Sequence, residues 1–202
     1  MNTVITIGRE FGSGGREFGY KLAKELEVAY YDKQILSEIV DKTEYSREYV
    51  QDIIESRPSY IMPSTVSVGT SIGCEYQLIQ MKEIVQAQTE VILEMASRSS
   101  CVIVGRCADY ILRDVENVRL FRIFIYADLQ SRIKRCIDRA PEGENYTAKE
   151  LEKHIKRVDK NRAGYYSDFT LQKWGDKNNY DLCINTSKIR IDDAVTNVAK
   201  LL

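Results

Sequence analysis

The sequence lacks any hydrophobic run long enough to cross a membrane. Its apolar runs fall short of the roughly 18 residues of a membrane span, and the N-terminal MNTVITIG has no basic lead before its apolar stretch. The chain has 202 residues, 44% of them hydrophobic, enough to bury the core of one domain or of one domain with a small insertion. We expect a cytoplasmic protein without a membrane partner.

Charge imbalance and paired cysteines are also missing. The 29 basic and 30 acidic residues nearly cancel, so net charge gives no argument for a nucleic-acid partner. The five cysteines are scattered, and none belongs to a C-x-x-C pair, which favours reduced thiols over a disulfide framework or a zinc site. No G-x-S-x-G or H-E-x-x-H motif occurs, which weakens hydrolase and zinc-enzyme interpretations.

Short β-branched apolar runs are present, and most are followed by a helical pattern. Strands are expected at 4–7, 28–31, 101–104, 120–126 and 180–185, and helices at 16–26, 33–42, 46–55, 75–98, 128–139, 147–162 and 191–202. Thr147 with Glu150 forms a capping box, and Asp128 is a helix N-cap. This alternation predicts an α/β fold with a parallel sheet and helices on both faces.

The segment 57–73, RPSYIMPSTVSVGTSIG, interrupts this pattern. It contains two of the three prolines and several hydroxyl residues, so it predicts an irregular excursion between helices. Loops of this length are often functional. The segment is therefore either a flap over a site or an ordinary long loop.

The stretch VITIGREFGSGGREFGYKLAKEL places glycines between a predicted strand and a predicted helix. A dinucleotide-binding G-x-G-x-x-G turn begins at Gly12 and Gly14, but its last position is Glu17. Asp32 would suit the ribose role of that motif. The strand is expected to end near Ile7, which leaves a longer loop than a dinucleotide turn has. This length favours a phosphate-binding loop.

The phosphate-loop pattern G-x-x-x-x-G-K-[ST] is incomplete because it has no lysine. Its physical requirement is a set of backbone N–H groups directed inward at a helix N-terminus. The residues of Gly12-Ser13-Gly14-Gly15 can form that concavity, and the Arg16 guanidinium can neutralise a phosphate. The alternative is a tightly packed turn with Arg16 exposed.

Positive charges recur where such a site would need them. Arg132, Arg135 and Arg139 share one helix face directly after a strand, at the sheet edge where α/β proteins bind ligands. Lys153, Arg157 and Lys160 form a second stripe, which is more typical of a solvated face. Each stripe could line a lid.

Several blocks resemble the cytidylate kinase-like family, relatives of bacterial cytidylate kinase among the P-loop nucleoside-monophosphate kinases. The opening VITIGREFGSGGREFGYKLAKELEVAYYDKQIL is followed in order by VIVGRCADYIL, FRIFIYADLQSRIKR, VDKNRAGYY and WGDKNNYDLCINTS, which together span nearly the whole chain. The resemblance implies a three-layer P-loop NTPase-like fold with a five-stranded parallel sheet. It also implies an acceptor-binding insertion at about 43–80 and a helical lid at about 132–165.

The resemblance assigns roles to the remaining polar residues. Arg106 would hold the acceptor's phosphate, and Asp109 would orient Arg106 or the acceptor; alternatively these two form a local ion bridge. Asp159 and Arg162 match acceptor-recognition and lid positions. Lys33 and Glu38 stand where serine and arginine are usual, and the lysine and hydroxyl positions of the loop fall on Gly15 and Glu17. These departures concern positions that affect catalytic rate and nucleobase choice.

The leading hypothesis is a kinase that moves the γ-phosphoryl group of ATP, with Mg²⁺, to a small phosphorylated acceptor such as CMP or dCMP. The expected donor site consists of Gly12, Ser13, Gly14, Gly15, Arg16 and Glu17, and the expected Mg²⁺ ligand is Glu17 or Asp32. The expected acceptor site consists of Asp32, Lys33, Arg106, Asp109 and Asp159. The arginines expected to close over the transfer are Arg16, Arg132, Arg135 and Arg162. Alternatives are a non-catalytic nucleotide-binding module, a kinase of another metabolite and, most distantly, a nicotinamide oxidoreductase. The chain is expected to be a monomer or a homodimer.

Overall fold

The computed structural model describes residues 1–55, 71–141, 144 and 146–202. Its described residues form one parallel sheet in the order β2-β3-β1-β4-β5. The strands are β1 (Asn2–Arg9), β2 (Ala29–Tyr31), β3 (Cys101–Val104), β4 (Val118–Tyr126) and β5 (Leu182–Asn185). The predicted α/β class with a five-stranded parallel sheet is confirmed.

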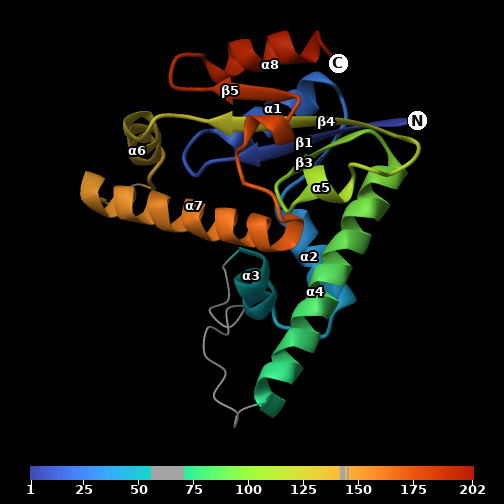
Figure 1. The fold of residues 1–202 in the computed structure, drawn as a ribbon. Coiled ribbons are helices and arrows are strands. Elements are labelled where there is room, and N and C mark those ends of the chain that lie inside the picture. The colour runs from blue at the N-terminus through green and yellow to red at the C-terminus, as the bar shows by residue number, and fades with distance from the viewer. Residues whose placement is uncertain (56–70, 142–143, 145) are drawn as a thin grey trace.

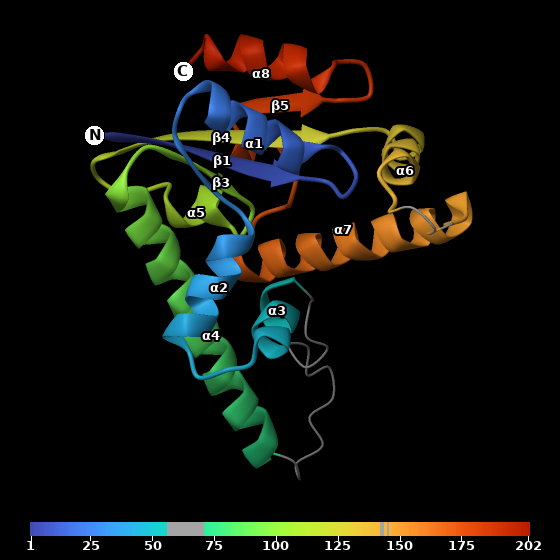
Figure 2. The same ribbon diagram turned by 180° about the vertical axis from the view of Figure 1, so that it is seen from behind.

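Helices cover both faces of the sheet (Figures 1 and 2). One face carries α1 (Gly15–Glu25) and α8 (Ile191–Ala199), and the other carries α2 (Lys33–Lys42), α4 (Ser71–Arg98) and α5 (Ala108–Ile111). The other helical segments are α3 (Arg47–Glu55), α6 (Leu129–Asp138), α7 (Ala148–Thr170) and the 3₁₀ turn η2 (Lys177–Asn179). Figure 1 places α6 and the start of α7 beyond the carboxyl ends of the strands.

The alternation of side chains along β1 divides the core between the two faces. Ile5 and Ile7 are buried in one cluster with Phe18 of α1. Val4 is buried in the other cluster with Ile92 of α4. β1 is therefore fixed from both sides, and the segment that follows it starts from a rigid base.

The strand order distinguishes the two interpretations of the glycine-rich segment. β1 lies between β3 and β4, whereas the dinucleotide-binding fold has the order 3-2-1-4-5-6. The expected strand end at Ile7 was wrong, because β1 continues to Arg9 by pairing with Ile125 of β4. The loop is therefore shorter than expected, and its length is a weak argument for a phosphate-binding loop. The strand order is what excludes the dinucleotide-binding fold.

Other differences from the predicted elements lie in helices. α7 continues to Thr170 instead of ending at 162, because Tyr166 and Thr170 are buried. α5 was not predicted from sequence. Most of the excursion expected at 57–73 lies outside the described residues, and its last part, 71–73, belongs to α4. The acceptor-binding role of 43–80 and the lid role of 132–165 stay predictions.

The long helix α4 packs through its carboxyl-terminal half onto its own sheet, where Ile84, Ile92 and Met95 are buried. Nearer its amino end, α4 contacts α3 and the turn before it. Tyr45 of that turn is hydrogen-bonded to Glu83, and Tyr49 of α3 donates to Gln80 at 3.0 Å. In the described part of the chain, no helix is both long enough and apolar enough to span a membrane.

Candidate active site

The loop after β1 enters helix α1 through two glycines in the left-handed region, Gly12 at φ 75° and Gly14 at φ 85°. The first helical hydrogen bond runs from the N–H of Phe18 to the carbonyl of Gly14, at 2.9 Å. The N–H groups of Gly15, Arg16 and Glu17 precede that bond, so they have no carbonyl of the helix as partner. They form the positive end of the α1 dipole.

The carbonyl groups of the loop are held from its outer side. Arg135 donates to the carbonyl of Gly12 at 2.8 Å and to that of Thr186 at 3.2 Å. The hydroxyl of Thr186 donates to the carbonyl of Ser13 at 2.6 Å. Because N–H and C=O point in opposite directions across a trans peptide, these bonds turn the following amides toward the other side of the loop. The N–H of Ser13 donates to the carbonyl of Glu10 at 3.4 Å, and the expected phosphate-binding role of the loop amides stays a prediction.

A second set of contacts fixes the start of the loop to α7. Asp159 accepts from the backbone N–H of Phe11 at 2.8 Å and pairs with Arg132 at 2.5 Å. Arg132 also lies 3.6 Å from Glu10, whose pKa is raised by burial. The side chain of Arg132 is 10% exposed, and that of Asp159 is 16% exposed. Arg132, Arg135 and Asp159 thus contact the loop itself; their predicted roles in closure and acceptor recognition remain untested.

Arg16 lies at the opposite side of the loop and reaches toward the end of β2. Its Nε pairs with Asp32 at 2.9 Å, while 52% of its side chain is exposed. Asp32 is buried and precedes α2, and Lys33 beside it is exposed. Arg16 and Asp32 therefore bind each other, and Lys33 keeps its acceptor role only as a prediction.

The two carboxylates considered for magnesium are both neutralised by cations. Glu17 pairs with Lys21 at 2.7 Å and with Arg139; burial acts to raise its pKa, but these hydrogen bonds outweigh it and lower the pKa. Asp32 pairs with Arg16. Among the described residues there is no group of three His, Cys, Asp or Glu side chains arranged for a metal. These residues do not by themselves build a metal site.

A pocket of about 340 Å³ opens beyond the carboxyl ends of β1 and β3, beside the loop. It brings together Arg106 and Asp109, as predicted, with residues of α7. It is lined by Gly8, Arg9, Ile54, Glu55, Gly105, Arg106, Cys107, Asp109, Arg157, Val158, Asn161, Arg162, Tyr165, Tyr166, Trp174 and Tyr180. Ligand pockets in α/β proteins typically lie at this edge of the sheet.

The proposed pairing of Arg106 with Asp109 was wrong. Arg106 pairs with Glu55 of α3 at 2.6 Å and also donates to the carbonyl of Ile54, so its guanidinium is held by α3. Asp109 instead accepts from the hydroxyl of Tyr166 at 2.7 Å. Burial raises the pKa of Asp109, and the bond from Tyr166 offsets part of that rise.

Guanidinium groups dominate the charge of the pocket. Burial and the nearby charge of Arg162 lower the pKa of Arg9, while Asp32 acts in the opposite direction. Burial likewise lowers the pKa of Arg162, against the effect of Asp159. Arg162 donates to the carbonyl of Arg9 at 3.1 Å. Clustered buried cations of this kind favour an anionic ligand.

Sequence reasoning missed Arg9, Tyr165 and Tyr166. Arg9 could have been found, because it directly follows the first apolar run, where the rule that singled out Arg106 applies equally. The tyrosines lie beyond the expected end of their helix. Trp174 and Tyr180 pack against Phe124, and they also line the pocket.

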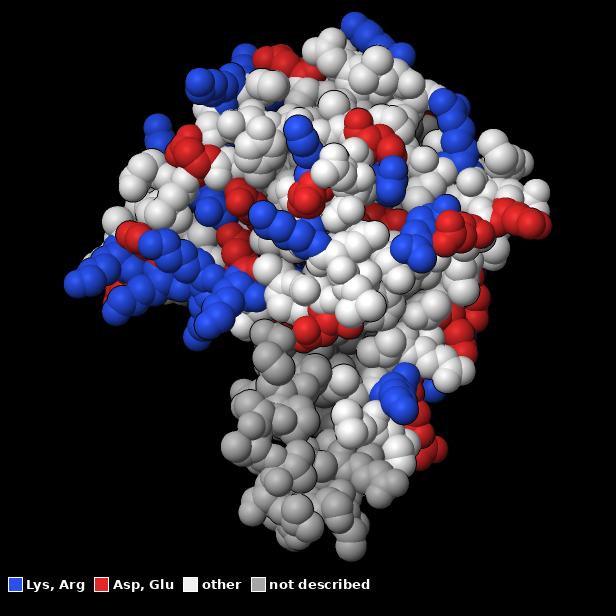
Figure 3. Space-filling model, in the orientation of Figure 1, with Lys and Arg blue, Asp and Glu red and all other residues white. Residues whose placement is uncertain are grey.

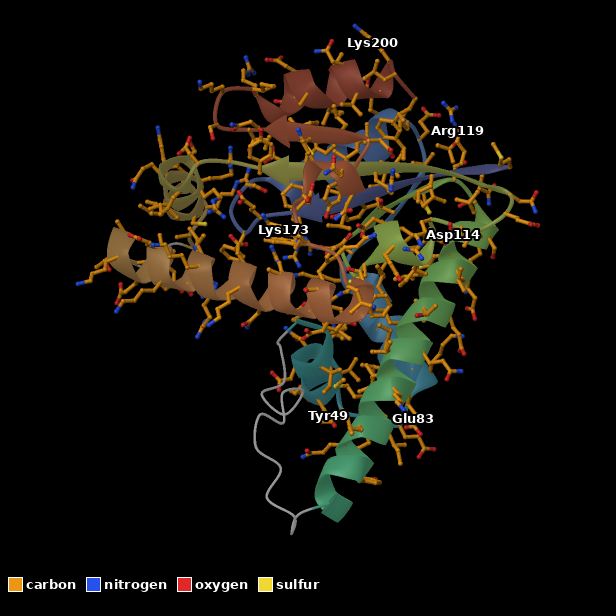
Figure 4. All side chains as sticks on the ribbon, in the orientation of Figure 1. Tyr49, Glu83, Asp114, Arg119, Lys173 and Lys200 are labelled. Carbon is orange, nitrogen blue, oxygen red and sulfur yellow. The ribbon has the colours of Figure 1, made fainter. Side chains whose placement is uncertain are left out.

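Other charged groups lie away from the pocket or on its rim. Figure 3 shows Lys and Arg gathered over the amino-terminal part of α7, where Lys153, Arg157 and Lys160 are exposed. Only Arg157 of these three lines the pocket. Figure 4 places Asp114 and Arg119 at the opposite end of the sheet, where β1 begins. The stripe on α7 is thus mainly a solvated face.

The parallel sheet, the amide-lined loop and the adjoining pocket define a protein with a kinase-like α/β fold. The chain belongs to the cytidylate kinase-like family, whose profile matches residues 4–188. The family resemblance inferred from the sequence is thereby confirmed. A search of curated proteins gave no match.

Solved structures support the same fold. A crystal structure of an uncharacterized protein from Eubacterium ventriosum is 30% identical, with a TM-score of 0.69 and coverage of 98% of this chain and 97% of that one. Shikimate kinase from Bacteroides thetaiotaomicron is 14% identical, with a TM-score of 0.56 over 100% and 98% of the two chains. Shikimate kinase from Acinetobacter baumannii, in complex with shikimate, is 15% identical, with a TM-score of 0.52 over 100% and 92%.

Proposed function

We propose that this protein is an ATP-dependent phosphotransferase that moves the γ-phosphoryl group to a small anionic acceptor, with CMP and dCMP as the first candidates. The observation that carries the proposal is the pairing of two features. One is the set of unpartnered amides at the start of α1, and the other is the arginine-lined pocket beside them. The membership of the chain in the cytidylate kinase-like family supports the nucleotide acceptor.

In the proposed reaction, the amides of Gly15, Arg16 and Glu17 hold the β- and γ-phosphates of ATP. An ionised oxygen of the acceptor attacks the γ-phosphorus, the bond from that phosphorus to the bridging oxygen breaks, and ADP leaves with the electron pair. A phosphate acceptor is already ionised at neutral pH, so the step needs no general base. Positioned positive charge supplies most of the catalysis in such transfers.

In this proposal, different pocket residues contact different parts of the acceptor. Arg106 and Arg162 contact the anionic group of the acceptor, and Asp109 and Tyr166 form hydrogen bonds with the other polar groups of the acceptor. Arg132 and Arg135 position the loop, and Arg16 holds Asp32. Magnesium would neutralise charge on the phosphates of ATP, and the carboxylates of Asp32 and Glu17 would be its candidate oxygen ligands from this chain.

A second acceptor class follows from the charge of the same pocket. Arginines bind a carboxylate as readily as a phosphate, so a small carboxylated metabolite is the alternative. The likeness to a shikimate kinase solved with shikimate concerns the fold, and it makes shikimate a sensible member of the test panel. A non-catalytic nucleotide-binding module is the third possibility, because the loop lacks its lysine and hydroxyl.

An ADP-release assay with ATP, magnesium and a panel of acceptors tests the proposal. The panel contains the common nucleoside monophosphates and shikimate, and Arg106→Gln is compared with Arg119→Gln at the far end of the sheet. We expect turnover with CMP or dCMP that Arg106→Gln reduces and Arg119→Gln leaves unchanged. Calorimetric binding of ATP with no turnover on any acceptor would identify the non-catalytic module instead.

A further inference from the structure

The loop position that corresponds to the missing lysine is Gly15, and the structure gives a physical reason for a glycine there. A Cβ atom built on Gly15 would lie 2.5 Å from Cβ and 3.0 Å from Cγ of Arg9. The first of these distances is far below an ordinary contact between carbons. The stem of Arg9 thus occupies the space that any side chain at position 15 would need.

The guanidinium of Arg9 continues from the loop toward β3. A Cβ atom built on Gly105 would overlap Nη1 of Arg9 and lie 2.9 Å from its Cζ. The glycines at positions 15 and 105 therefore leave a passage for this one side chain. The passage runs from the phosphate loop to the pocket, which Arg9, Gly105 and Arg106 all line.

Arg9 has too few partners for a buried cation. Within the described residues, its nearest carboxylate is that of Asp32, at 3.8 Å from Nη2, and its buried Nε has no hydrogen-bond partner. Its side chain is only 13% exposed. A buried guanidinium normally has its donors satisfied, so this geometry is suited to an anion that the free chain does not contain.

Arg16, the cation expected from sequence, is placed differently. Its Nε already pairs with Asp32 at 2.9 Å, and half of its side chain faces solvent. Charge in a solvated position contributes less to binding than charge in a desolvated one. Arg9 is therefore the better placed of the two for a phosphate bound at the loop.

The geometry points to Arg9 as the cation that replaces the phosphate-loop lysine: it reaches from the end of β1 past Gly15 and contacts the γ-phosphoryl group between donor and acceptor. This inference rests on the proposed function and adds a catalytic residue to it. Arg9 stays protonated throughout. It stabilises the negative charge on the oxygens of the transferred phosphoryl group while the bond to ADP breaks and the bond to the acceptor forms.

The first experiment compares Arg9→Gln, Arg9→Lys, Arg16→Gln and the distant control Arg119→Gln. Calorimetry measures the affinity for ATP, ADP and tripolyphosphate, the last being independent of base and acceptor. Loss of a hydrogen bond to a charged group lowers affinity by about 10- to 100-fold, so Arg9→Gln should weaken the binding of ATP and tripolyphosphate by about that factor and that of ADP by much less. Arg9→Lys should recover part of the loss, since lysine lacks the planar fork.

The outcomes separate the inference from the proposed function. Unchanged affinity of Arg9→Gln for ATP and tripolyphosphate, or a loss confined to Arg16→Gln, would overturn the role of Arg9 and leave the kinase proposal standing. A wild-type chain that binds neither ATP nor tripolyphosphate would overturn both.

A relocated charge gives an independent test. Arg9→Gly removes the Cβ that obstructs position 15, so the double variant Arg9→Gly with Gly15→Lys can place an ammonium group at the usual position of the loop. We expect the double variant to bind tripolyphosphate at least about ten times more tightly than Arg9→Gly alone. A double variant with an unchanged circular dichroism spectrum and no gain in affinity would contradict the replacement.

Discussion

Two groups of arginines lie near the glycine-rich loop, and they differ in what their guanidinium groups contact. Arg132 and Arg135 of α6 donate to main-chain carbonyls of the loop, and Arg132 also pairs with Asp159. Arg9 and Arg162 are partly buried and line the pocket; Arg162 donates to the carbonyl of Arg9, and the Nε of Arg9 has no hydrogen-bond partner among the described residues. The first group builds the site, whereas the second has charge left for a ligand.

This difference shows that counting cations near a sheet edge does not identify catalytic ones. An arginine whose donors are occupied by backbone carbonyls stabilises the loop and has few donors left for a phosphate. A lowered pKa does not separate the two groups, because burial and the nearby charge of Arg139 also lower the pKa of Arg135. The groups differ in their contacts: Arg135 donates to the carbonyls of Gly12 and Thr186, whereas the Nε of Arg9 has no hydrogen-bond partner among the described residues. The two groups should therefore respond in opposite ways to neutralisation.

The largest effect is expected where the first group is broken. Asp159→Ala removes the acceptor for the N–H of Phe11 and leaves Arg132 buried without its closest partner. Breaking a buried ion pair costs about 3 kcal/mol of unfolding free energy or more. Urea unfolding measures the loss, and ATP affinity should fall with it because the loop is no longer fixed.

The matched control for Asp159→Ala lies on the same helix. Lys156→Ala breaks the exposed pair of Lys156 with Glu152, 2.6 Å apart, in which the side chains are 66% and 39% exposed. Such a pair is worth at most about 0.5 kcal/mol. Equal losses in the two variants would mean that the contacts of Asp159 do not hold the loop.

A smaller effect, and one of the opposite kind, is expected in the second group. Arg162→Gln removes a charge whose pKa is lowered mainly by burial, while the amide can still donate to the carbonyl of Arg9. Turnover should fall about 100-fold, or about 2.7 kcal/mol in transition-state stabilisation. The thermal midpoint should stay the same or rise, as measured by circular dichroism. A midpoint lowered as much as in Asp159→Ala would show that Arg162 belongs with the loop-building arginines.

Local signals in the sequence predicted much of the fold. The strand expected at 101–104 is β3, and the capping box of Thr147 with Glu150 and the N-cap at Asp128 are both present. These features depend on neighbours within a few residues. The alternation of predicted strands and helices along the chain likewise predicted the parallel sheet.

The site was less predictable because its contacts join distant parts of the chain. No local pattern indicated that Arg132 pairs with Asp159, or that Arg106 pairs with Glu55. Tyr166 was placed outside its helix, so its bond to Asp109 could not be expected. Residue types at the predicted strand ends located the region of the site, whereas tertiary packing determines which side chains contact each other there.

The smallest expected effect concerns Asp109, the buried carboxyl group of the pocket. Its pKa is raised by burial above the ordinary value of 3.8, so the folded state holds the proton more tightly than the unfolded state. As pH rises from about that value through the folded pKa, the unfolded carboxyl is ionised first, and the stability of the wild type should fall. The slope is at most about 1.4 kcal/mol per pH unit for one proton.

Asp109→Asn removes this titration and retains an oxygen that can accept from Tyr166. Urea unfolding of both proteins across the acidic range should therefore show the variant gaining stability relative to the wild type as pH rises, until the folded carboxyl is ionised. A relative loss over the same range would mean that ionised Asp109 is stabilised by the pocket arginines. In that case the cations of the pocket would already have an internal counter-ion, and the contrast between the two arginine groups would weaken.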